Sequence, residues 1–176
     1  FPFTSDRAKE KVVDLAEVLA QYQPKMELKV VNFTELQKEI NDKCPDRLMT
    51  LVMRRLMFKI AEQITANHHG QALVTGESMG QVASQTMDAL KVTNSVPTMP
   101  VFRPLIGLDK LEIEARAREI GTYETSIQPY EDCCTVFVPK HPETYPKLAE
   151  VKKAEEKLAA DDLIKQAVAE VETVNI

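Results

Sequence analysis

The sequence contains no run of eighteen apolar residues, so it predicts no transmembrane helix. Its first seven residues, Phe1–Arg7, form neither a basic nor an apolar segment, which argues against a secretory signal peptide. They also lack an initiator methionine, which fits a start inside a longer protein. Cysteine is scarce, with 3 residues, and this odd number does not suit a secreted disulfide framework. These absences favour a cytoplasmic protein.

A basic surplus is also missing, because the formal net charge is −5. Proteins that bind nucleic acid on their own usually carry an excess of positive charge. A local basic patch is still compatible with this charge, but another domain would then supply most contacts to phosphate. The sequence has no CxxC pair and no HxxxH spacing, so it predicts no metal site.

What remains is the composition of an ordinary globular domain, with 44% hydrophobic and 28% charged residues in a chain of 176. Strands alternate with helices, which indicates an α/β fold with a parallel sheet. Asp109 is expected to cap one helix, and Gly70 and Gly121 to end two others. Apolar periodicity predicts helices over 5–21, 34–40, 46–67, 81–90, 110–120 and 147–171, and strands over 26–33, 71–75 and 101–103.

One candidate site is the string Thr75-Gly76-Glu77-Ser78-Met79-Gly80-Gln81, which follows an expected strand and opens an expected helix. In open parallel sheets, ligands bind at the carboxyl ends of the strands. The glycines would let the backbone approach a ligand, and the N–H groups of the helix would favour an anion. The string matches neither GxGxxG nor GxxxxGK[ST]. An ordinary tight turn explains the same residues, so spacing alone leaves both interpretations open.

A second candidate is the adjacent pair Cys133 and Cys134, which lies in a proline-rich stretch. A loop cysteine near polar groups can become a reactive thiolate. Lys140, His141 and Arg103 are cations that could lower a thiol pKa if the fold brings them close. The alternative is that both cysteines are small packing residues, as free cysteines often are.

The third candidate is the pair Arg54 and Arg55 within the long helix expected over 46–67. Adjacent helical residues point about 100° apart. One arginine could therefore face solvent or a ligand while the other packs its stem against the protein. A pair of solvated side chains is the alternative interpretation.

Six strings, taken together and in order, carry a family resemblance. They are Phe3–Ala8, Leu73–Thr86, Arg103–Lys110, Glu119–Tyr123, Pro129–Phe137 and Pro139–Pro142. These strings resemble the tRNA 4-thiouridine synthetase family, whose members also serve thiamine biosynthesis, and the resemblance covers essentially the whole chain. It implies a PP-loop fold (adenine-nucleotide α-hydrolase-like) whose N-terminal strands and phosphate loop, of SGGxDS type, would lie before Phe1.

The resemblance also implies a reaction. The family adenylates O4 of a uridine at position eight of tRNA, using ATP with Mg²⁺, and a cysteine persulfide then delivers sulfur and displaces AMP. Carried over by position, the residues that contact ATP would be Arg54, Gly76 and Gln85. Cys134 would carry the persulfide, with Cys133 the less favoured choice.

The same resemblance divides the chain into a partial ATP-binding domain (1–127), a cysteine-bearing loop (128–146) and a C-terminal helix (147–176). It implies as partners tRNA, a cysteine desulfurase and the sulfur-carrier protein of thiamine synthesis, and no membrane. Without the phosphate loop, the chain alone is expected to bind ATP poorly. Strand pairing across a homodimer stays open. Two alternatives are an adenine-nucleotide-binding module without sulfur chemistry and a domain whose C-terminal helix docks a partner.

Overall fold

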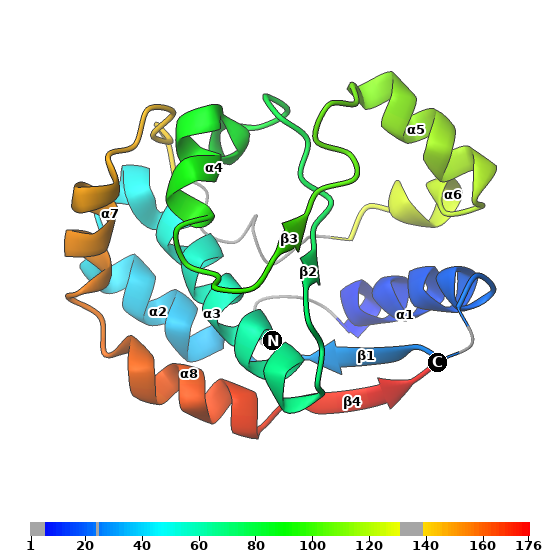
Figure 1. The fold of residues 1–176 in the computed structure, drawn as a ribbon, viewed down its shortest axis with the longest axis horizontal. Helices are drawn as coiled ribbons and strands as arrows, with labels where there is room; N and C mark the ends of the chain where they lie inside the picture. The colour runs from blue at the N-terminus through cyan, green and yellow to red at the C-terminus, as the bar shows by residue number, and fades with distance from the viewer. Residues whose placement is uncertain (1–5, 24, 131–138) are drawn as a thin grey trace.

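The computed structural model describes residues 6–23, 25–130 and 139–176. Figure 1 shows one group of helices gathered around the long helix α3, with two short pairs of strands beside it and α1, α5 and α6 on the other side. The elements are α1 (Asp6–Ala20), β1 (Glu27–Val30), α2 (Thr34–Lys43), η1 (Asp46–Leu48), α3 (Met49–Asn67), β2 (Leu73–Val74), η2 (Ala83–Gln85), α4 (Met87–Thr93), β3 (Val101–Phe102), α5 (Lys110–Glu119), α6 (Tyr123–Ser126), α7 (Leu148–Glu155), α8 (Ala160–Ala169) and β4 (Glu172–Asn175).

The hydrophobic core is built around α3, which α2, α7 and α8 contact directly. We call these four helices the helical core. Side chains on several faces of α3 are buried, among them Leu51, Val52, Leu56 and Ile60. A helix that is apolar over so much of its surface must be covered by other elements. No helix in the described part of the chain is long and apolar enough to cross a membrane.

The strands form two separate pairs. β2 and β3 are parallel, with Leu73 opposite Val101, which confirms the expected parallel pairing of these segments. β1 instead pairs antiparallel with β4, with Glu27 opposite Asn175 and Val30 opposite Glu172. The fold is therefore a mixed α/β arrangement with a small parallel sheet, and the expectation of parallel strands alone was incomplete.

The expected single helix over 147–171 is wrong. The chain leaves helical geometry at Ala159, where φ is −78° and ψ is 48°, and so forms α7 and α8 instead. This break lets Val151 of α7 and Ile164 of α8 both enter the helical core. The strand β4 then follows, and its pairing with β1 was not predicted.

The helix expected over 81–90 begins later than predicted. α4 starts at Met87, and the Thr86 side chain caps it by accepting a hydrogen bond from the Ala89 amide. The loop after β2 therefore does not open directly into an α-helix, because the short helix η2 comes between the loop and α4. The end of α3 also differs, because His69, and not Gly70, adopts the left-handed conformation with φ of 59°.

Candidate functional site

The carboxyl ends of the parallel strands β2 and β3 bring four polar residues together. Thr75 and Glu77 follow β2, and Arg103 follows β3. The Thr75 amide donates to the Phe102 carbonyl at 3.0 Å, which keeps the two strand ends side by side. Arg54 reaches the same place from α3. We call these four residues the Glu77 cluster.

Glu77 is the centre of this cluster and is only 2% exposed. Its Oε2 accepts a hydrogen bond from Arg103 Nε at 2.7 Å and another from the Thr75 hydroxyl at 3.0 Å. Its Oε1 accepts from Arg54 Nη2. One carboxylate thus holds two guanidinium groups from different elements in fixed positions, with the charge-assisted bonds that arginine forms well.

The electrostatics of the Glu77 cluster favour an ionised carboxylate. Burial acts to raise the pKa of Glu77, but the hydrogen bond from Arg103 and the charge of Arg54 outweigh it and hold the pKa below its ordinary value. Two arginines against one carboxylate leave the cluster with one surplus positive charge. The cluster therefore offers an anion a partly desolvated cationic site.

The cluster also contains buried donors without a partner. Among the residues that the structure describes, neither Arg54 Nε nor Arg103 Nη2 has a hydrogen-bond partner, although both atoms are buried. Leaving a buried donor unpaired costs about 1–3 kcal/mol. Such atoms in a folded protein call for an explanation, such as a ligand.

The loop that begins at Thr75 is held by its backbone. Met79 N donates to the Ile106 carbonyl at 3.1 Å, and Gly80 N donates to the Gln85 carbonyl at 2.9 Å. Gly80 takes the left-handed conformation, with φ of +81°. Gly76 does not, and a Cβ added there would meet no atom within 4 Å. The protein's own packing therefore does not require glycine at 76, which leaves open space beside the backbone.

The structure brings some of the predicted site residues together. Arg54 contacts Glu77, the neighbour of Gly76. Gln85 is half-buried in η2, at the far end of the same loop. Cys133 and Cys134 lie outside the described residues.

The two arginines of α3 have different surroundings. Arg55 is buried and bonds Glu155 of α7 through Nε at 2.6 Å. Arg54 is partly exposed and belongs to the Glu77 cluster. The alternative of two solvated side chains is therefore wrong, because Arg55 is packed in the core. That Arg54 faces a ligand stays a prediction.

The third cysteine, Cys44, has the properties of a packing residue. It lies against the helical core, and burial raises the pKa of its thiol to about 11. Because the thiolate is the reactive form, a pKa this high keeps Cys44 unreactive near neutral pH.

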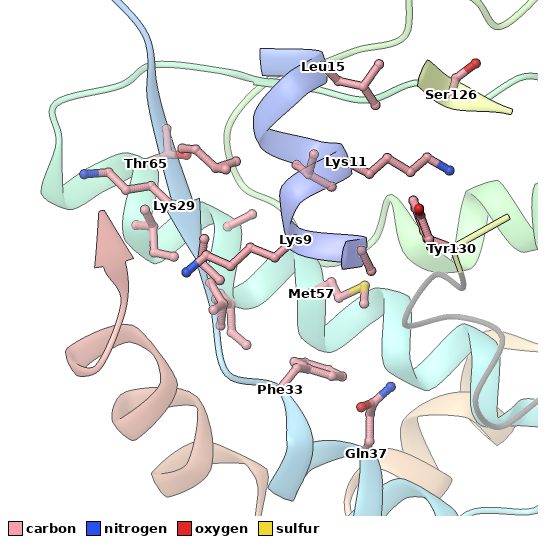
Figure 2. A pocket seen from close by; sticks show the side chains of 18 residues that line it. Lys9, Lys11, Leu15, Lys29, Phe33, Gln37, Met57, Thr65, Ser126 and Tyr130 are labelled. Atoms are coloured by element: carbon pink, nitrogen blue, oxygen red, sulfur yellow. The ribbon is translucent and has the colours of Figure 1, made fainter. Parts of the chain in front are cut away.

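A separate hollow of about 810 Å³ lies between α1, β1 and α3 (Figure 2). Its lining is mostly apolar, and the lysines at its edge have other partners. Lys9 pairs with Glu172 at 2.7 Å, and Lys11 donates to the Gln128 carbonyl at 3.0 Å. Because the lining of the hollow is mostly apolar, the Glu77 cluster is the better candidate for chemistry.

Comparison with known proteins now places the chain. The family described as "Thiamine biosynthesis protein (ThiI)" matches residues 1–160. The chain belongs to this family. The ThiI match ends shortly after α8 begins, so most of α8 and β4 lie beyond it.

Relatives within this group carry a more specific description. The chain is 65% identical over 157 residues to the probable tRNA sulfurtransferase of Caldanaerobacter subterraneus subsp. tengcongensis, covering 89% of this chain and 41% of that protein. It is 56% identical over 176 residues to the probable tRNA sulfurtransferase of Acetivibrio thermocellus, covering 100% of this chain and 45% of that protein. The chain therefore spans less than half the length of these relatives.

A solved structure is similar over nearly the whole chain. It is the crystal structure of a 4-thiouridine synthetase–RNA complex with bound ATP. The match has a TM-score of 0.94 with 41% sequence identity and covers 99% of this chain and 46% of that one. At this identity the likeness reaches beyond a shared fold to a shared family.

Three residues of the cluster, Thr75, Glu77 and Arg103, were not among the predicted nucleotide contacts. Glu77 stands inside the candidate string, where an acidic residue just after an expected strand was the available signal. Arg103 was considered only as a cation for the cysteines, whereas the structure pairs it with Glu77. Nothing in the local sequence connects two residues that are 26 positions apart.

Proposed function

We propose that the full-length protein is an ATP-dependent tRNA sulfurtransferase that forms 4-thiouridine at position eight of tRNA and also supplies sulfur for the thiamine thiazole. The observation that carries this proposal is the similarity, at 41% identity and over 99% of the chain, to a 4-thiouridine synthetase solved with RNA and ATP. The probable tRNA sulfurtransferases among the relatives support the same activity.

Activation of the uridine is the first step of the proposed reaction. O4 of the base attacks the α-phosphorus of ATP, and the bond to pyrophosphate breaks. This turns the oxygen at C4 into a good leaving group. Magnesium would enter with the nucleotide, bound to its phosphates.

Arg54, Gly76 and Gln85 are the proposed nucleotide contacts. The open space beside Gly76 supports a close approach of the ligand to the backbone. Arg54 is fixed by Glu77 and has a buried Nε without a partner in the described chain, which suits a contact with an anionic group. Gln85 would hydrogen-bond near the nucleotide, from the other end of the same loop.

Sulfur transfer is the second step, and Cys134 is the proposed carrier, with Cys133 as the alternative. The terminal sulfur of a cysteine persulfide attacks C4, and AMP leaves with the former O4. A second thiol then breaks the S–S bond, which releases thiouridine and leaves a disulfide. Cys44 does not suit either thiol role because the pKa of its thiol is about 11.

The proposal extends to organisation and partners. Residues 1–127 would form part of a PP-loop ATP-binding domain, residues 128–146 the cysteine-bearing loop, and residues 147–176 a C-terminal segment that packs onto it. The parallel pair β2–β3 supports the first assignment. A cysteine desulfurase would load the persulfide, and the substrate would be tRNA, with a sulfur-carrier protein as the acceptor in thiamine synthesis.

The test compares Cys134→Ala with Cys44→Ala in the full-length protein. Thiouridine formation on tRNA is measured by nucleoside analysis, and adenylation by release of pyrophosphate. We expect Cys134→Ala to abolish thiouridine while pyrophosphate release continues, and Cys44→Ala to preserve both. Thiouridine formation by Cys134→Ala at the unmodified rate would refute the role of Cys134. A complete protein that neither binds ATP nor thiolates tRNA would refute the function.

A further inference from the structure

We propose that Arg103 is a second phosphate-binding residue of the nucleotide site and that Glu77 is the positioning residue that holds Arg54 and Arg103 side by side. This inference rests on the proposed function, because it takes the ligand to be the polyphosphate of ATP. It adds Glu77 and Arg103 to the nucleotide site, for which the family resemblance implies only Arg54, Gly76 and Gln85.

The first argument is geometric. Arg103 uses Nε to bond Glu77 at 2.7 Å and Nη1 to approach the Val101 carbonyl at 3.4 Å. Its Nη2 is buried and has no partner in the described chain. Two of its nitrogens are thus committed to holding the side chain, while the third is free to bond a ligand.

The second argument is the charge balance. Glu77 neutralises one of the two arginines, so the Glu77 cluster carries one surplus positive charge in a partly buried place. A compact phosphoryl group can pair with that charge and accept bonds from both guanidinium groups. An RNA backbone instead needs several cations along an extended surface. The cluster therefore suits the phosphates of a nucleotide better than those of tRNA.

The third argument concerns the role of Glu77. It touches both arginines and is 2% exposed, so a ligand would meet the arginines and not the carboxylate. Without the carboxylate, the two guanidinium groups would repel each other and lose their common anchor. Glu77 would then act by holding the donors of Arg54 and Arg103 in place before the reaction begins. Preorganised donors are most effective where charge develops, which here is at the phosphates during adenylation.

The test measures the affinity of the full-length protein for ATP, adenosine and tRNA by calorimetry or equilibrium dialysis. The variants are Arg103→Gln, Arg103→Lys and a control, Arg116→Gln, which removes an arginine from the exposed surface of α5. Losing a charged hydrogen bond to phosphate predicts a fall of about 10- to 100-fold in ATP affinity for Arg103→Gln. Affinities for adenosine and tRNA should stay within about twofold, and Arg103→Lys should recover part of the loss.

The role of Glu77 is tested by the kinetics of adenylation in Glu77→Gln. The variant keeps both arginines and removes the negative charge that neutralises one of them, so the added attraction for phosphate offsets the lost anchoring and we expect the KM for ATP to stay unchanged or fall. We expect kcat to fall about 10- to 100-fold, because the donors lose their fixed geometry. A purely structural role would lower the melting temperature, and kcat per folded molecule would then be unchanged.

Several outcomes would overturn the inference. They are ATP binding by Arg103→Gln at wild-type strength, equal losses for ATP and adenosine, and a loss confined to tRNA. These are distinguishable from failure of the proposed function, in which the unmodified full-length protein would itself not bind ATP. An unmodified protein that binds ATP, with an Arg103→Gln variant that binds it equally well, would refute only this inference.

Discussion

Two carboxylates in this chain, the buried Glu77 and the partly buried Glu155, each hold two cations, and they do so in different ways. Glu155 of α7 accepts from Arg55 Nε at 2.6 Å and pairs with Lys59 at 2.5 Å, both on α3. Glu77 accepts from Arg54 and Arg103 at the strand ends. Burial raises the pKa of both carboxyl groups, and in both cases the cations outweigh burial and lower it.

The difference lies in where the remaining donors go. Arg55 Nη1 bonds the Val92 carbonyl at 2.8 Å and the Ser95 hydroxyl at 2.7 Å, and no buried Arg55 donor is left unpaired by the described residues. This arginine joins α3, α7 and the end of α4. The Glu77 cluster leaves two buried donors that no residue of the described ranges pairs with. The same combination of charges thus serves as a structural joint in one place and as a candidate ligand site in the other.

The largest expected effect on the free energy of unfolding comes from breaking the structural joint at Glu155. Glu155→Ala leaves Arg55 buried and without its charge partner, which should destabilise the chain by about 3–5 kcal/mol. Urea unfolding followed by circular dichroism measures this change. The control is Glu156→Ala, an exposed neighbour whose replacement should change stability by about 0.5 kcal/mol or less. Equal effects of the two substitutions would remove the structural role of Glu155.

A smaller effect is expected when the same experiment is done at the Glu77 cluster. The side chains of Arg54 and Arg103 are 21% and 15% exposed, so water can partly solvate them once Glu77→Gln removes the carboxylate. We expect the free energy of unfolding to fall by about 1–3 kcal/mol, because the variant leaves buried polar groups without a partner. A loss as large as that of Glu155→Ala would mean that the Glu77 cluster is also mainly a structural joint.

Within the helical core, the sequence predicted α2 and α3 best. These two helices, which contain Ile40 and Leu56, show apolar periodicity, and burial against one another then stabilises them. The strand β4 was missed because its pairing with β1 joins residues nearly 150 positions apart, such as Glu27 and Asn175. Local sequence around Val174 carries no sign of that partner.

The candidate site could be predicted only in part, for a similar reason. The string from Thr75 to Gln81 marked the place, but the cluster needs Arg54 and Arg103, which only the fold brings together. The start of α4 did have a local signal. Thr86 is a favoured capping residue, as the structure shows. Because the loop was expected to end at Gly80, the helix was predicted to begin six residues too early.

The pH dependence of the free energy of unfolding should show a contribution from each of the two carboxylates, Glu77 and Glu155. Each has a folded-state pKa below its ordinary value of 4.5, so its contribution is fully present above that value and is lost as pH falls through the folded-state pKa. Stability should therefore hold from neutral pH down to about 5 and decline below about 4.5. In Glu155→Gln the decline should be shallower, as measured by urea midpoints across this range. An equally steep decline would mean that Glu155 gains nothing from its ion pairs.

The smallest expected effect is a change in the labelling rate of Cys44, which distinguishes the helical core around Glu155 from the Glu77 cluster. Its thiol contacts the Ala154 carbonyl at 3.9 Å, beside Glu155, and burial raises the thiol pKa to about 11. At pH 8 only about one thiol in a thousand is then ionised, so a thiol reagent should modify Cys44 slowly in the folded chain. Glu155→Ala loosens the helical core next to Cys44 and should speed this reaction several-fold, whereas Glu77→Gln should leave its rate unchanged.

The rate is followed by mass spectrometry of the labelled peptide containing Cys44. Equal acceleration by both substitutions would show that the Glu77 cluster and the helical core open together, and the distinction between joint and site would then be lost.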